Sequence, residues 1–186
     1  MKKNWRTFLI RAASALVAVA LLVTLFVLFQ EQGIKYAIIG VVLIGIFELN
    51  KLLLKEESLF IKALFSILAL LVFISTISSL SVGSVTIALA FVIFCVMSFI
   101  HLHKTADITH ISLLHAKASL GLIYMGLLPA FCYRIIDQAY GLEWFVFMLA
   151  TVFAGDTFAY IFGMLFGRHK MMPRISPKKT WQGSIG

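Results

Sequence analysis

The sequence predicts an all-α protein, a polytopic transmembrane helical bundle of about six spans with both ends in the cytoplasm. Of its 186 residues, 61% are hydrophobic and 13% are charged, and the mean hydropathy is +1.01. Soluble domains are about 25% charged, so this composition excludes a soluble globular domain and a disordered chain. An outer-membrane barrel is excluded as well, because its strands alternate apolar and polar residues, whereas here the apolar residues run unbroken.

Each expected span is an apolar stretch close to the ~20 residues that a helix needs to cross the hydrocarbon core of a bilayer. The first span follows four basic residues. It is longer than the apolar core of a signal peptide, about 7–15 residues, so we interpret it as uncleaved. The expected spans are residues 12–29, 35–54, 63–80, 82–100, 118–136 and 144–166, followed by a basic cytoplasmic tail over 167–186 that ends in the start of a further helix.

The distribution of lysine and arginine predicts the orientation of the bundle. With the N-terminus placed in the cytoplasm, 14 of these residues fall on cytoplasmic segments, and two, Lys35 and Arg134, fall outside. This asymmetry follows the positive-inside rule. The net charge of +8 is therefore a topology signal, and we expect a lipid bilayer and no nucleic acid as the partner.

Two acidic residues lie within expected spans, where an ionisable group is costly and is often functional. Asp156 is near the middle of the last span and shares a helix stripe with Tyr160. It either makes interhelical hydrogen bonds or lines a catalytic, metal-linked or substrate cavity. Glu48, near the cytoplasmic end of the second span, is either an interfacial partner of Lys51 or a cavity group. Small residues recur beside Asp156 at every fourth position and predict a close helix contact: Gly155, Ala159, Gly163 and Gly167.

The longest polar connection, residues 101–117, contains four histidines. A His-x-His pair with two further imidazoles is compatible with a zinc site. A solvated loop at the membrane interface is the alternative. The histidines are His101, His103, His110 and His115.

The basic tail contains the most specific local signal. Ser176 followed by Pro177 predicts a helix start, with serine as the N-cap and proline in the first turn. Free amides at such a terminus bind anions. A basic anchor for anionic lipids is the alternative interpretation. Positive charge and an interfacial aromatic group surround this start: Arg174, Lys178, Lys179 and Trp181.

Three motifs near the end of the chain have a distinctive order and spacing: Gly155–Tyr160, Gly167–Lys170 and Ile175–Trp181. Together they resemble the phosphatidate cytidylyltransferases, or CDP-diacylglycerol synthases. Glu48 is similar to an acidic residue of that family at the corresponding place. The resemblance covers the N-terminal two-thirds of the family pattern, and it departs from that pattern at Gln182, where the family has glutamate.

The resemblance implies an enzyme of phospholipid biosynthesis that transfers CMP from CTP to phosphatidic acid and releases pyrophosphate. It implies a multi-pass protein of the inner or plasma membrane with the tail facing the cytoplasm, Mg²⁺ as cofactor, and a homodimer as a hypothesis. It implies catalytic roles for Asp156, Lys178 and Lys179, with Asp156 as the expected metal ligand. It implies substrate binding by Arg174, Ser176, Pro177, Thr180 and Trp181, and cavity positions for Glu48 and Tyr160.

Further motifs of the family would lie beyond Gly186. We therefore expect the chain to be truncated and, by itself, catalytically incomplete. Two alternatives to the cytidylyltransferase stay open at this point. One is a CTP-dependent lipid kinase of related type, and the other is a non-catalytic truncated membrane fragment.

Overall fold

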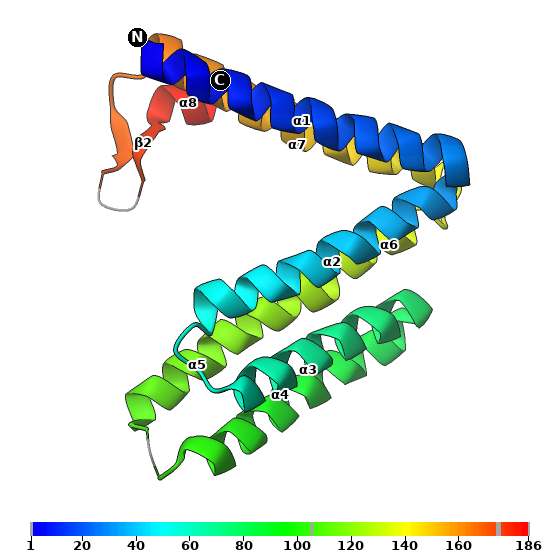
Figure 1. Ribbon diagram of the computed structural model, residues 1–186, viewed down its shortest axis with the longest axis vertical. Coiled ribbons are helices and arrows are strands. Elements are labelled where there is room, and N and C mark those ends of the chain that lie inside the picture. Colours follow the sequence, from blue (N-terminus) through cyan, green and yellow to red (C-terminus); the bar gives the residue numbers. More distant parts are fainter. Residues whose placement is uncertain (1, 105, 174–175, 186) are drawn as a thin grey trace. The chain divides into compact units, whose positions relative to one another are not determined.

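The chain folds as two compact units, Met1–Gln138 and Ala139–Gly186, in the computed structural model, which describes residues 2–104, 106–173 and 176–185. The elements of the first unit are α1 (Lys2–Phe29), α2 (Glu31–Leu53), α3 (Leu59–Ser78), α4 (Leu80–Leu102), α5 (Ile108–Gly121), the π-helix η1 (Leu122–Leu127) and α6 (Leu128–Ile135) (Figure 1). The elements of the second unit are α7 (Gly141–Phe166), β1 (Lys170–Met172), β2 (Ser176–Thr180) and α8 (Trp181–Ile185).

Among the described residues, five helical segments are long and apolar enough to cross a membrane. They are α2, α3, α4, the continuous helix Ile108–Ile135 formed by α5, η1 and α6, and α7. The described apolar part of α1, Leu16–Phe29, is shorter, and it lies within the first expected span. The predicted class of a polytopic helical membrane protein is confirmed, with one small β-hairpin added in the tail.

The core of the first unit forms around α3, which packs against α4, η1 and α6. One face of α3 is buried at helical spacing: Ile61, Phe65, Leu68, Ala69 and Val72. Phe65 meets Phe94 of α4 edge to face, with 6.5 Å between the ring centroids. Gly83 lets α4 approach closely, because a Cβ there would lie 2.4 Å from Thr76 Oγ1. Small residues at such contacts are typical of helix packing in membranes.

Polar side chains join three helices at the end of the unit where α2 begins. Lys35 is buried, forms an ion pair with Asp137, and lies 5.1 Å from the ring centroid of Tyr133. Arg134 Nη1 donates to the carbonyls of residues 76 and 77 at 3.3 and 3.1 Å. Helix C-termini lack donors for their last carbonyls, so Arg134 caps α3. The two basic residues that the charge distribution places outside are therefore both used in packing.

The membrane-crossing segment Ile108–Ile135 contains an irregular turn before Pro129. Proline has no N–H for the carbonyl four residues earlier, and its ring clashes there. The π-helix η1, over Leu122–Leu127, widens the helix just before this position. Gly126 makes room for the wide turn against α3, because a Cβ there would lie 2.9 Å from Val72 Cγ1.

The expected polar loop over residues 101–117 is shorter in the structure. The helix α5 begins at Ile108, and Ile111, Leu114 and Ala118 are buried on one of its faces. This apolar spacing of three and four residues is the helical period. His115 and Lys117, between these positions, obscure the pattern in the sequence. The connection between α4 and α5 is therefore shorter than expected, because α4 ends at Leu102 and α5 begins at Ile108.

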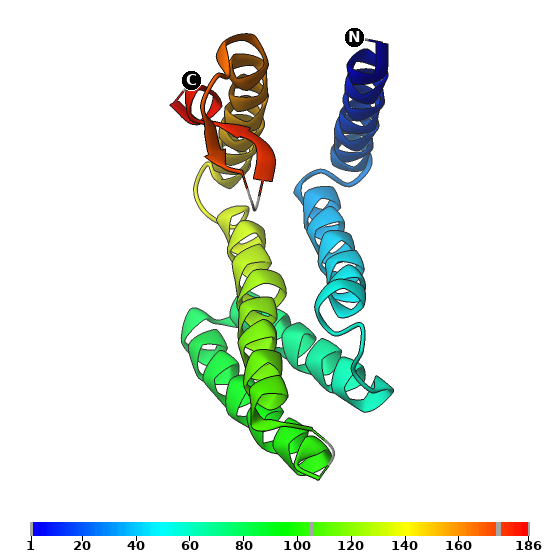
Figure 2. The same ribbon diagram turned by 90° about the vertical axis from the view of Figure 1, so that its left-hand side faces the viewer.

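In the second unit an antiparallel hairpin follows α7, with Lys170 opposite Thr180. The prediction that a helix starts at Ser176 and Pro177 is wrong, because β2 occupies this stretch and α8 begins only at Trp181. Proline is tolerated in edge strands, and both strands of a two-stranded sheet are edges. Figure 2 shows the hairpin and α8 beside the C-terminal part of α7.

Candidate functional site

Small residues hold the hairpin and α8 against the last turns of α7. A Cβ at Gly183 of α8 would lie 2.6 Å from the carbonyl oxygen of Ala159 and 2.9 Å from Gly163 Cα. A Cβ at Gly167 would lie 2.1 Å from the carbonyl oxygen of Gly163 and 2.9 Å from Thr180 Oγ1. The stripe of small residues predicted on α7 therefore packs against a helix, and this helix is α8 of the tail.

The N-cap of the tail helix is Thr180 and not Ser176. Thr180 Oγ1 accepts a hydrogen bond from the backbone N–H of Gly183 at 3.3 Å, which is the side-chain bond of an N-cap. The N–H of Trp181 donates to the carbonyl of His169 at 3.0 Å. The start of α8 is thus tied both to its own cap and to the segment that leaves α7. Ser176 instead lies in β2, partly buried.

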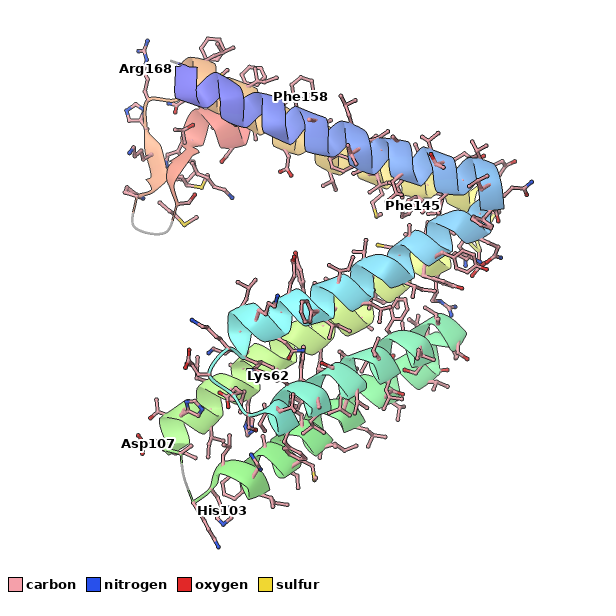
Figure 3. The ribbon with its side chains drawn as sticks, viewed as in Figure 1. Lys62, His103, Asp107, Phe145, Phe158 and Arg168 are labelled. Atoms are coloured by element: carbon pink, nitrogen blue, oxygen red, sulfur yellow. The ribbon has the colours of Figure 1, made fainter. Side chains whose placement is uncertain are left out.

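Gln182 closes the hairpin at its base. Its Oε1 accepts from the backbone N–H groups of Arg168 and His169 at 3.2 and 3.3 Å. Its Nε2 lies 3.1 Å from His169 Nδ1, so the amide donates there when that nitrogen is unprotonated. Arg168, at the start of the hairpin, is labelled in Figure 3. Sequence reasoning noted Gln182 only as a departure from the family pattern. The interaction depends on a hairpin that the sequence does not predict.

The other predicted site residues of the second unit are mostly exposed. Asp156 lies on α7 with its side chain exposed, one helical turn before Tyr160, which is 40% exposed. Lys179 is exposed on β2, and Trp181 is 53% exposed at the start of α8. The structure therefore groups Thr180, Trp181 and the strand bearing Lys179, with Asp156 further along α7. Three predicted positions lie outside the described residues or side chains: Arg174, Pro177 and Lys178.

Glu48 belongs to the first unit, where it is exposed on α2. The ion pair considered for Glu48 and Lys51 is absent among the described residues. The ammonium of Lys51 lies instead 4.1 Å from the ring centroid of Phe47. An interaction of a cation with an aromatic face is favourable at exposed sites, so Lys51 is held beside an apolar ring rather than beside a carboxylate.

Within the part of the chain that the structure describes, no three side chains of the kinds that hold metals come together. The described histidines therefore do not form the cluster that the zinc interpretation requires. His110 instead pairs with Glu57, and His115 lies 2.7 Å from Ser98 Oγ. The second unit has two acidic residues, Glu143 and Asp156, separated along α7 by about 20 Å at 1.5 Å per residue. These two carboxylates are too far apart to hold one metal ion together, and no step is derived through a metal.

The fold and the tail define an integral membrane protein in which a compact basic hairpin and a short helix pack on the end of a long apolar helix. The chain belongs to the Cytidylyltransferase family, whose model matches residues 9–186.

Several phosphatidate cytidylyltransferases are similar to this chain over short segments. The protein from Staphylococcus saprophyticus is 40% identical over 67 residues, which are 36% of this chain and 25% of that protein. The protein from Mycobacterium bovis is 41% identical over 61 residues, or 31% of this chain and 20% of that protein. Phosphatidate cytidylyltransferase 1 of Arabidopsis thaliana is 48% identical over 46 residues, or 25% of this chain and 11% of that protein. The matched segments thus span about a quarter or less of the length of these relatives.

Proposed function

We propose that this protein acts in the synthesis of CDP-diacylglycerol, transferring CMP from CTP to phosphatidic acid. The family match over residues 9–186 is the observation that carries the proposal. The architecture supports it, because the lipid substrate stays in the bilayer while CTP arrives from water. We expect the hairpin, which follows the membrane-crossing helix α7, to lie at the membrane surface where these two substrates meet.

The proposed reaction joins two polyanions. A phosphate oxygen of phosphatidic acid attacks the α-phosphorus of CTP, and a new P–O bond forms. The bond from the α-phosphorus to the bridging oxygen of the β-phosphate breaks, and pyrophosphate leaves with that electron pair. Cationic groups lower the repulsion between the reactants and stabilise the charge that develops on the leaving group.

The hairpin supplies exposed cations for this task. Arg168, Lys170 and Lys179 are exposed on or beside the two strands. We assign Lys179 and its neighbour Lys178 to the phosphates of CTP. Gln182, Thr180 and the glycine contacts position these strands on α7 and are not assigned to the substrate. Magnesium, the role of Asp156 and a homodimer stay predictions that the family resemblance implies.

The positive-inside distribution supports a cytoplasmic position of the hairpin, in the inner or plasma membrane. This is the side on which CTP is available. Asp156, Tyr160 and Glu48 are proposed to contribute polar surface toward the reacting headgroup.

The experiment measures lipid labelling by membranes that contain the protein. They are supplied with phosphatidic acid, magnesium and CTP labelled at the α-phosphate, and membranes without the protein are the control. Label in the lipid extract together with released pyrophosphate supports the proposal. Release of CDP, with label carried on the γ-phosphate instead, indicates the lipid kinase. An absence of both lipid labelling and CTP binding contradicts the proposal.

The residue test compares Lys178→Ala and Lys179→Ala with Lys104→Ala, an exposed lysine between α4 and α5. A hydrogen bond to a charged group is worth about 1.5–3 kcal/mol. Losing one phosphate contact should therefore raise the CTP concentration needed for half-maximal rate by roughly 10- to 150-fold, with little change in the dependence on phosphatidic acid. An unchanged CTP dependence in both hairpin variants would leave these lysines as membrane anchors only.

A further inference from the structure

A pocket of about 550 Å³ lies in the first unit, where α2 ends and α3 begins. Three lysines line it: Lys51 in the last turn of α2, Lys55 in the connection, and Lys62 in the first turn of α3. Figure 3 labels Lys62 at this junction. Both helices are long and apolar enough to cross a membrane. Their junction therefore falls at the level of the lipid headgroups.

The rest of the pocket wall is largely apolar. Phe47 and Leu59 are 60% and 82% exposed, and Ala63 adds a small apolar side chain to the lining. Lys51 lies over the Phe47 ring, so its charge stands directly beside this apolar wall. Long cationic side chains that combine an apolar stem with a charged head suit a membrane interface. The pocket thus pairs a cationic rim with a surface that an acyl chain can contact.

The positive charge of the rim is not neutralised by the protein. No carboxylate lines the pocket, and among the described residues none of the three lysines forms an ion pair. Glu57, in the same connection, pairs elsewhere: its side chain is 6% exposed, and its Oε1 lies 3.0 Å from His110 Nε2. Lys62 Nζ donates one hydrogen bond, to the carbonyl of Lys55 at 2.9 Å. An ammonium has three donors, so the rim keeps donors available for an anion.

The floor of the pocket is held by a short hydrogen-bond chain. Asn50 Nδ2 of α2 donates to Ser66 Oγ of α3 at 2.8 Å, and Ser66 Oγ donates to the carbonyl of Lys62 at 2.8 Å. This chain joins the two helices and fixes the spacing of the lysines that they carry. Asn50 Oδ1 is buried and has no hydrogen-bond partner. Buried polar atoms are rarely left unpaired unless water or a ligand group completes them.

We propose that this pocket binds the headgroup phosphate of an acidic glycerophospholipid, with the lysines on the phosphate and an acyl chain along Phe47 and Leu59. The charge of the rim selects an anion, and the exposed apolar wall selects a lipid over a soluble phosphate. The site is built only from residues of the first unit. The proposed lipid site does not depend on the proposed CTP reaction.

The test uses the full chain in phosphatidylcholine nanodiscs that contain a photoactivatable phosphatidylglycerol, without CTP. Peptide mass spectrometry locates the captured lipid, which is expected on the segment from Phe47 to Ser66. The double variant Lys51→Gln/Lys62→Gln is compared with Lys104→Gln/Lys117→Gln, which removes the same charge elsewhere. One basic residue near an anionic surface contributes about 1 kcal/mol. The loss of two such residues should therefore weaken capture at this segment about 25-fold, and only in the pocket variant.

A second variant, Ala63→Trp, fills the pocket without changing its charge and should also abolish capture. Circular dichroism and thermal unfolding verify that each variant is folded. Unlabelled phosphatidylglycerol should compete, whereas phosphatidylcholine and soluble glycerol phosphate should not. The proposal is overturned if both double variants lose capture equally, if Ala63→Trp captures normally, or if glycerol phosphate competes as well as the lipid.

Discussion

Gln182 acts through its backbone partners and shows how a single amide can organise the start of the tail. It accepts two hydrogen bonds from consecutive backbone N–H groups and faces the ring of His169. A glutamate at this position can accept the same two bonds, but it cannot donate to an unprotonated ring nitrogen. The replacement of the family's glutamate is therefore compatible with the fold of the hairpin, and it alters the interaction with His169.

We predict that Gln182→Ala loosens the base of the hairpin while Gln182→Glu largely preserves it. Each lost bond is worth about 0.5–1.5 kcal/mol, and these bonds are exposed, so the local cost is at the low end. Hydrogen exchange of the amides of Arg168 and His169 should become roughly 3- to 10-fold faster in the alanine variant. Equal acceleration in both variants would show that the amide nitrogen, and not Oε1, holds the hairpin.

The ion pair of Lys35 and Asp137 gives a second prediction at the residue scale, because its two partners differ in burial. The side chain of Lys35 is 8% exposed, whereas that of Asp137 is 53% exposed. Removing Asp137 leaves a buried cation without its counter-ion, which is the costly case. Removing Lys35 leaves a carboxylate that water can solvate.

We therefore expect Asp137→Ala to lower the melting temperature in detergent more than Lys35→Met does. The difference should be about 1–3 kcal/mol in the free energy of unfolding. The exposed residue Gln138, next to Asp137, serves as a control when it is changed to alanine. A larger effect of Lys35→Met would mean that packing on Tyr133, and not charge, dominates this contact.

At the scale of elements, the contact between α7 and α8 rests on the absence of side chains. Gly183 faces the backbone of α7, where an added Cβ would meet the carbonyl oxygen of Ala159 at 2.6 Å. Gly155, on the same stripe of α7, has no atom within 4 Å of the corresponding position. A side chain is therefore excluded at Gly183, whereas there is room for one at Gly155.

We predict that Gly183→Ala displaces α8 from α7, whereas Gly155→Ala leaves the tail in place. Overpacking of this kind costs about 1–3 kcal/mol. Limited proteolysis within residues 176–185 should become faster in the Gly183 variant alone. Protection of the tail in both variants would show that the helix contact tolerates a shift of the backbone.

Local sequence signals predicted the membrane helices well and the tail poorly. Hydropathy locates α2, α3, α4 and α7, because crossing a bilayer imposes a length and a composition on each segment by itself. The hairpin depends on pairing between residues that are ten positions apart, Lys170 and Thr180. Ser176 and Pro177 carry a real helix-start preference, and tertiary contacts override it. The lysine pocket was not predicted, because it exists only once two helices meet.

At the scale of the whole molecule, orientation in the membrane is the property that the charge distribution predicts most directly. The structure identifies exposed positions in or next to three connections: Gln32 in the first turn of α2, Lys104 between α4 and α5, and Gln138 after α6. These positions alternate along the chain, so the predicted topology puts Gln32 and Gln138 on the outer side and Lys104 in the cytoplasm.

We predict that single cysteines at Gln32 and Gln138 react with an impermeant thiol reagent on intact cells, and that a cysteine at Lys104 reacts only after lysis. The native Cys95 and Cys132 are replaced by alanine beforehand, since both are free thiols. Protection of both outer positions, with labelling at Lys104 on intact cells, would reverse the orientation and place the hairpin away from CTP.

The connection between α3 and α4 consists of Ser79 alone. Its hydroxyl lies 3.0 Å from that of Ser81, and its N–H donates to the carbonyl of Ser75, so its polar groups are largely satisfied locally. When the protein is inserted into the membrane, the connection that must cross the bilayer is therefore one small uncharged residue and not a polar loop. The two helices are in contact through Gly83 and Thr76. They therefore suit insertion together as one helical hairpin, because no polar loop between them has to cross the bilayer.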